Sequence, residues 1–130
     1  MWRVTYWYPS NEHRGEDVSE YYVSGVQTGK KLILESLPNT DESYILVRLT
    51  IDGNLATGTW EETTSPHGEF EGAIYSGALQ LLVSKDQKRL EGMWVGIGQD
   101  HESEKPQIYS GRWEIVRAGN KTDDTKTTAK

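Results

Sequence analysis

The sequence predicts an all-β protein, an eight-stranded antiparallel up-and-down barrel that occupies residues 1–117. Three observations support this fold class. Apolar and polar residues alternate along most of the chain with the two-residue period of strands, and no window argues for a long helix. Glycine occurs 13 times and tryptophan 5 times, whereas the helix formers alanine and leucine are sparse. Short and long connections between the alternating segments also follow one another in strict order.

Eight segments have this strand-like alternation. They span residues 2–8, 18–27, 31–36, 44–51, 55–63, 73–83, 90–97 and 108–116. In the fourth segment, a uniformly apolar face runs from Ile45 to Ile51, whereas Arg48 belongs to the more polar face and is expected outside the barrel. In the first segment, alternation alone leaves open whether Tyr6 or Trp7 faces inward.

The later segments carry a Gly-x-Trp step three times, at 58–60, 92–94 and 111–113. Residues two apart in a strand share a face, so each glycine leaves room beside a large ring. The opposite faces of the strands that carry Trp60 and Trp113 hold threonine, serine and charged residues, which prefer water. We therefore expect the tryptophans to point inward, where they either line a pocket or fill the core.

The connections predict two different ends. Turn formers at 28–30, 52–54 and 84–89 make three tighter connections, and four longer ones each contain one proline. The longer connections are 9–17, 37–43, 64–72 and 98–107. In an up-and-down meander they all leave from one end, which predicts a barrel with a mouth and a closed base. The alternative is an open sheet or a sandwich with the same loop lengths.

Composition and motifs argue against several function classes. The net charge of −6 opposes a broad grip on nucleic acid, and the absence of cysteine excludes disulfides and thiolate metal sites. With no basic and apolar leader and no run of eighteen apolar residues, we expect a cytoplasmic protein without a membrane span. Glu61 and Glu62 alternate faces, and no nucleophile elbow or phosphate-binding glycine loop occurs, so we expect neither catalysis nor a cofactor. Residues 118–130 are expected to form a disordered polar tail.

Charge differs between the two predicted ends. Acidic residues dominate the four longer connections and basic residues the tighter turns. The mouth should therefore favour a cation, a neutral apolar molecule or a basic protein segment over a phosphate, unless the acids only keep the rim soluble. The histidines His13, His67 and His101 all lie in the longer connections, but their spacings match no metal-ligand signature, and we expect no metal.

Residues 2–116 resemble a calycin, or lipocalin-like, barrel in their Gly-x-Trp steps, loop pattern and aromatic first strand. More locally, four strings resemble barrel domains that follow a helix-turn-helix domain in some actinobacterial regulators. These strings are WYPS at 7–10, LATGTW at 55–60, YSG at 75–77 and EGMWVGIG at 91–98. No such helix pair is present here, so we expect no DNA contact by this domain. In architecture the chain also resembles the lipocalin-like barrel receptors of bacterial anti-phage signalling, which bind cyclic dinucleotides.

Either resemblance implies a sensor rather than an enzyme, with an effector domain either linked to it or separate. We therefore expect a ligand-sensing barrel that takes a small aromatic or apolar molecule in its interior or mouth. The expected ligand-binding residues are Tyr6, Tyr8, Trp60, Trp94, Trp113, Arg48, His67 and His101. Two alternatives stay open: a cyclic dinucleotide receptor, and a protein-interaction module with a filled core.

Overall fold

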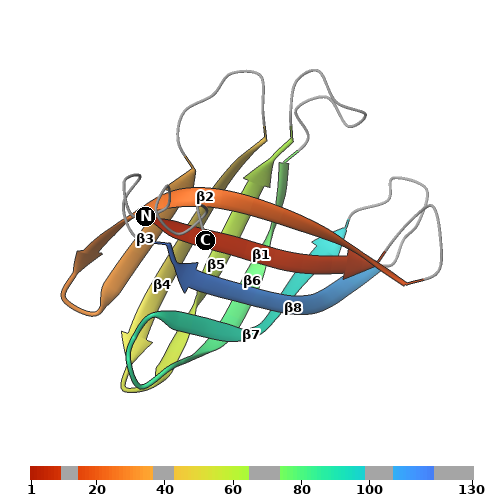
Figure 1. The fold of residues 1–130 in the computed structure, drawn as a ribbon. Coiled ribbons are helices and arrows are strands. Elements are labelled where there is room, and N and C mark those ends of the chain that lie inside the picture. The colour runs from red at the N-terminus through yellow and green to blue at the C-terminus, as the bar shows by residue number, and fades with distance from the viewer. Residues whose placement is uncertain (10–14, 37–42, 65–73, 99–106, 119–130) are drawn as a thin grey trace, which may run out of the picture.

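Eight antiparallel strands close into a barrel in the computed structural model, which describes residues 1–9, 15–36, 43–64, 74–98 and 107–118 (Figure 1). The strands are β1 (Trp2–Pro9), β2 (Glu16–Thr28), β3 (Lys31–Ser36), β4 (Tyr44–Asp52), β5 (Leu55–Thr63), β6 (Ile74–Val83), β7 (Arg89–Gly98) and β8 (Gln107–Arg117). Each strand pairs with its sequence neighbours, and β8 closes the barrel against β1 with Trp113 opposite Tyr6. The predicted all-β, up-and-down barrel is confirmed.

Strand ends extend beyond the predicted segments where the ladder continues. β2 begins at Glu16 because this residue pairs with Pro9, the last residue of β1. Proline has no N–H to donate, so the end of a strand is a position where it disturbs the ladder least. At the other end of the chain, the N–H of Ala118 donates to the carbonyl oxygen of Met1 at 2.9 Å. Ala118, the first residue of the expected tail, thus continues the pairing of the termini, and the rest of that segment lies outside the described residues.

The two ends of the barrel differ in their connections. Because neighbouring strands run in opposite directions, the connections β1–β2, β3–β4, β5–β6 and β7–β8 all leave from one end, which we call the mouth end. The three tight turns leave from the base end. Two of those turns use Gly29 and Gly53, whose φ values of 61° and 64° lie in the left-handed region that favours glycine. The prediction that the longer connections share one end is therefore confirmed.

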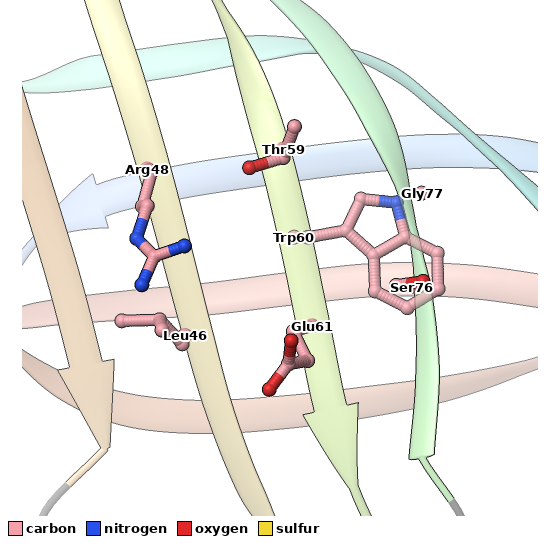
Figure 2. Close-up of a pocket in the computed structure, with 7 residues that line it drawn as sticks. All are labelled: Leu46, Arg48, Thr59, Trp60, Glu61, Ser76 and Gly77. Atoms are coloured by element: carbon pink, nitrogen blue, oxygen red, sulfur yellow. The ribbon is translucent and has the colours of Figure 1, made fainter.

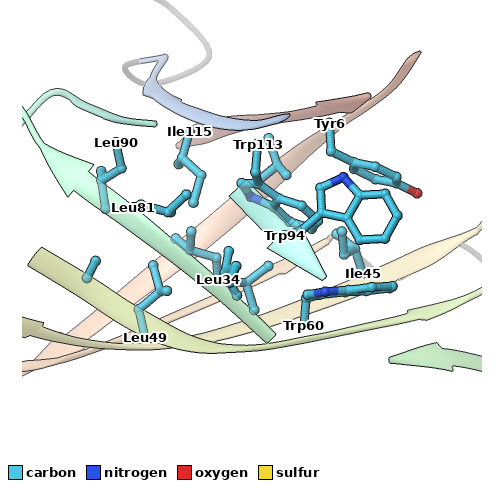
Figure 3. Close-up of a cluster of buried hydrophobic side chains, with 14 of the residues drawn as sticks. Tyr6, Leu34, Ile45, Leu49, Trp60, Leu81, Leu90, Trp94, Trp113 and Ile115 are labelled. Carbon is cyan, nitrogen blue, oxygen red and sulfur yellow. The ribbon is translucent and has the colours of Figure 1, made fainter. Parts of the chain in front are cut away.

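The inner face changes character along the barrel axis (Figure 3). Toward the base end it is aliphatic, and toward the mouth end it is aromatic. The aliphatic part includes Leu34, Leu49, Leu81, Leu90 and Ile115; the aromatic part consists of Tyr6, Trp60, Trp94 and Trp113. All of these side chains are buried, which removes most of their apolar surface from water and holds the sheet closed.

Candidate functional site

The three tryptophans of the Gly-x-Trp steps occupy the centre of the barrel. Trp60, Trp94 and Trp113 are exposed by only 7%, 6% and 1%. The ring of Trp60 meets that of Trp94 edge-on at 5.5 Å between centroids and that of Trp113 at 5.9 Å. The predicted inward orientation is confirmed, and at the level of these rings the interior is occupied by side chains (Figure 3).

Each of two indole rings crosses the neighbouring strand at a glycine. The indole N–H of Trp60 on β5 donates to the carbonyl oxygen of Val95 on β7 at 3.2 Å, passing β6 at Gly77. A Cβ at Gly77 would lie 1.9 Å from that carbonyl oxygen and 2.7 Å from Trp60 Nε1. Because Gly77 has no side chain, the Trp60 indole can cross β6 and reach the Val95 carbonyl oxygen.

The same arrangement recurs one repeat later. The indole N–H of Trp94 on β7 donates to the carbonyl oxygen of Trp7 on β1 at 2.8 Å, passing β8 at Gly111. A Cβ at Gly111 would lie 2.1 Å from the carbonyl oxygen and 2.8 Å from Trp94 Nε1. In both crossings the glycine of one strand makes room for the tryptophan of the strand before it, and of these two glycines only Gly111 itself belongs to a Gly-x-Trp step.

Trp113 breaks this pattern. The strand that follows it around the barrel, β1, has Tyr6 rather than glycine at the paired position, and the Tyr6 ring stacks on Trp113 with 4.8 Å between centroids and 12° between planes. The Nε1 atom of Trp113 is buried and has no hydrogen-bond partner among the residues that the structure describes. Tyr6 also shows that the even-numbered residues of β1 face inward, while Trp7 lies outside beneath the Arg112 guanidinium at 4.5 Å.

A carboxylate lies next to this aromatic centre on its mouth side. The Tyr6 hydroxyl donates to Glu62 Oε2 at 2.5 Å, and the Tyr21 hydroxyl donates to the same oxygen. The rings of Tyr6 and Tyr21 are nearly parallel, with 6.5 Å between centroids, and Tyr8 packs against Tyr6 at 5.8 Å. Strands β1 and β2 therefore bring two phenol hydroxyls to the carboxylate of β5, and Tyr8 packs beside one of these phenols.

Burial raises the pKa of the Tyr6 hydroxyl well above its ordinary value, and the neighbouring Glu62 carboxylate raises it further. Burial and then the hydrogen bond to Glu62 raise the pKa of Tyr21 as well. Hydrogen bonds with Ser19 and Ser43 lower the pKa values of Tyr6 and Tyr21, respectively, without reversing the direction. Both phenols therefore stay protonated at neutral pH and act as donors to the Glu62 carboxylate.

Further inward-register residues surround this cluster toward the mouth end. Tyr75 pairs with Glu62 across β5 and β6, and Tyr109 is in register with Gly111 and Trp113 on β8. They are exposed by 40% and 42%, in contrast to the buried rings below them. We call the inner surface at the mouth end the tyrosine cup; it consists of Glu62 and the inward-phase tyrosines Tyr6, Tyr8, Tyr21, Tyr75 and Tyr109.

Arg48 lies on the outer face of β4, as the apolar pattern predicted. With Glu61 and Thr59 it lines a shallow depression of about 230 Å³ on the outer wall formed by β4, β5 and β6 (Figure 2). Trp60 also contributes to this lining, but Arg48 and the buried rings belong to opposite faces of the sheet. Arg48 is therefore not part of the tyrosine cup, and the predicted alternation of Glu61 and Glu62 is confirmed.

The histidines predicted at the mouth, His67 and His101, lie outside the described residues, as does His13. Within the described ranges, no group of three or more histidine, aspartate or glutamate side chains is arranged to hold a metal ion. No helix in the described part of the chain is long and apolar enough to cross a membrane.

Sequence reasoning missed four residues of the cup, Tyr75 and Tyr109 as well as the two that form its central hydrogen bond, Tyr21 and Glu62. All four have the inward phase of their strands; Tyr21 lies two residues before the buried Val23, and Glu62 two residues after the buried Trp60. This phase was the available signal, because a carboxylate in phase with a buried ring must find a partner inside.

Comparisons of the chain with protein-family models, with curated proteins and with solved structures found no match.

Proposed function

We propose that this chain is a non-catalytic, ligand-sensing barrel, and that its small-molecule site is the tyrosine cup at the mouth end rather than the deep interior. The observation that carries the proposal is the Glu62 carboxylate, which lies on the inner face of the barrel and is held by the hydroxyls of Tyr6 and Tyr21. The space below the cup is filled by tryptophan rings, so a ligand has to bind above them.

The cup combines the features of a small-molecule site. Its aromatic walls offer apolar surface, and its few polar groups converge on one point, which is how binding pockets fix the orientation of a ligand. The cup also lies directly on Trp94, whose ring meets Tyr6 at 6.2 Å. A bound ligand would therefore change the surroundings of a buried indole, and tryptophan fluorescence would report it.

The register of the arginines supports this proposal over a cyclic dinucleotide receptor. Two phosphates need converging cations, yet Arg3, Arg48 and Arg112 all have the outward phase of their strands. The inner face near Glu62 is instead anionic. A calorimetric titration with cyclic dinucleotides checks this point, and we expect no heat of binding.

The test of the proposed function is a titration of the protein with a metabolite and nucleotide panel, in which binding is measured by tryptophan fluorescence and by the indole N–H resonances in NMR. A ligand of the cup should shift the resonances of Trp94 and Trp60. Tyr8→Ala should weaken that binding, whereas the matched control Tyr22→Ala, on the outer face of β2 and half exposed, should not. A panel that shifts no indole resonance would refute the proposal.

The outer wall favours a second candidate, a protein-interaction module. Ile97 and Ile108 are cross-strand partners on β7 and β8, and they are 60% and 68% exposed. Val95 continues this apolar strip on β7. If this strip is the functional surface, Ile97→Lys should abolish capture of the partner while ligand titrations of the indoles stay silent.

A further inference from the structure

The charge on the inner face at the mouth end has one sign. Asp17 pairs with Tyr8 across β1 and β2 and shares its inward phase, and Glu62 faces inward from β5. Among the described residues with inward phase in this half of the barrel, none is lysine, arginine or histidine. A ligand that enters the cup therefore meets the Glu62 carboxylate, and the described inward-phase residues of this half include no cation.

The aromatic walls of the cup also favour a cation. An aromatic ring carries negative potential on its face, so several rings around one point attract a cation, above all when the point is partly shielded from water. Tyr8, Tyr21, Tyr75 and Tyr109 have the inward phase of their strands at this end and are partly exposed. Carboxylate and ring faces together give the chemistry of an ammonium-binding aromatic cage.

The hydrogen bonds of Glu62 fit this role. Both phenol hydroxyls donate to the same oxygen, so the carboxyl group is the acceptor in each bond. The two tyrosines hold the carboxylate in position within the aromatic wall, where it cannot turn out to solvent without losing both partners. The Glu62 side chain is thus held in place before a ligand arrives, which lowers the cost of ordering on binding.

Resting on the proposed function, we propose that the tyrosine cup selects an organic cation, a small molecule with an ammonium group attached to an apolar or aromatic body. The ammonium group approaches Glu62, and the body packs on the tyrosine rings.

The test uses three probes of the same size and different charge: benzylammonium, benzyl alcohol and benzoate. Each is titrated into the full chain at pH 7, and binding is followed by the indole N–H resonances of Trp60 and Trp94. Glu62→Gln removes the charge but keeps an acceptor for the two phenols. Its matched control is Glu61→Gln, which makes the same change in net charge on the outer face of the same strand.

We expect benzylammonium to bind at least about tenfold more tightly than benzyl alcohol, and benzoate not to bind. Glu62→Gln should weaken benzylammonium about tenfold and leave benzyl alcohol unchanged, and Glu61→Gln should match the wild type. Near-UV circular dichroism of both variants shows whether the aromatic core is intact.

Two results would overturn the inference and differ in what they leave standing. If benzyl alcohol or benzoate shifts the indole resonances as strongly as benzylammonium, or if the two glutamine variants bind alike, the cup binds ligands without selecting cations, and the proposed function survives. If none of the three probes shifts an indole resonance, cation selectivity is refuted, and the broader ligand panel decides the proposed function independently.

Discussion

Trp94→Phe and Trp113→Phe should lower the free energy of unfolding by different amounts, although both replace a buried tryptophan of the same repeat. The indole N–H of Trp94 donates to the carbonyl oxygen of Trp7 at 2.8 Å, whereas Trp113 Nε1 has no partner among the described residues. Phenylalanine keeps an aromatic ring in each position but removes the N–H. One substitution therefore breaks a hydrogen bond, and the other removes an unpaired donor.

The expected difference follows from three contributions. Each substitution removes about 40 Å³ of side chain, which costs about 2 kcal/mol in lost burial and cavity at either position. Trp94→Phe also loses a hydrogen bond and leaves a carbonyl oxygen less well satisfied, which adds about 1–2 kcal/mol. Trp113→Phe relieves an unsatisfied buried donor, which offsets about 1–2 kcal/mol. We therefore expect Trp94→Phe to be about 2–4 kcal/mol more destabilising than Trp113→Phe.

Urea denaturation followed by far-UV circular dichroism measures this difference without relying on the fluorescence that the substitutions change. The dependence on urea should keep the slope of the wild type, so that a change in midpoint reports stability alone. If Trp113→Phe proves as costly as Trp94→Phe, Trp113 Nε1 has an acceptor after all, and the argument from the broken repeat fails.

The remaining predictions concern the glycine crossings and the buried phenols. Gly77→Ala should lower the free energy of unfolding by about 2–4 kcal/mol in thermal denaturation, because its Cβ would lie 1.9 Å from the Val95 carbonyl oxygen and would both overpack the core and break the Trp60 hydrogen bond. Gly29→Ala should lower it by only about 1–2 kcal/mol, because the new Cβ meets open space and the cost is the backbone strain of alanine at a φ of 61°. The free energy of unfolding should also fall above pH 10, because unfolded tyrosines then ionise while the raised pKa values of Tyr6 and Tyr21 keep these residues protonated in the fold. In that range each of the two tyrosines lowers the free energy of unfolding by up to about 1.4 kcal/mol per pH unit, and below the unfolded pKa neither changes its pH dependence. In urea titrations, Tyr6→Phe should reduce the slope of the free energy of unfolding against pH by the equivalent of about one proton.

The sequence was sufficient to predict the barrel because its signal is periodic. Inward and outward residues alternate, so Ile45 to Ile51 marked the inner face of β4 and placed Arg48 outside. The Gly-x-Trp steps went further, because a glycine two residues from a tryptophan needs a packing reason. Local pattern and overall fold agree at these positions, which is the condition for a sequence to specify one structure.

The cup could not be predicted in the same way because its contacts run across the barrel. Tyr6 and Glu62 are 56 positions apart in the chain, and Tyr21 and Glu62 are 41 apart. Periodicity gives the face of each strand but not which residues meet across the interior, since that depends on tilt and register around the closed sheet. The unpaired Nε1 of Trp113 could not be predicted for the same reason. It depends on Tyr6 being the cross-strand partner of Trp113, whereas the corresponding partners of Trp60 and Trp94 are glycines.

The position of Glu62 within the fold argues for function over stability. A carboxylate on the inner face must be desolvated and given hydrogen-bond partners, and an apolar side chain of similar volume at such a position is often neutral or stabilising by comparison. The base half of the barrel takes that course, with aliphatic side chains such as Leu49, Leu81, Leu90 and Ile115 on its buried inner face. The mouth half instead places two phenols around one charge and leaves the neighbouring tyrosines partly exposed. Residues that a core alone does not require are thereby concentrated at the end where the inner face reaches solvent, which is where a ligand site has to be.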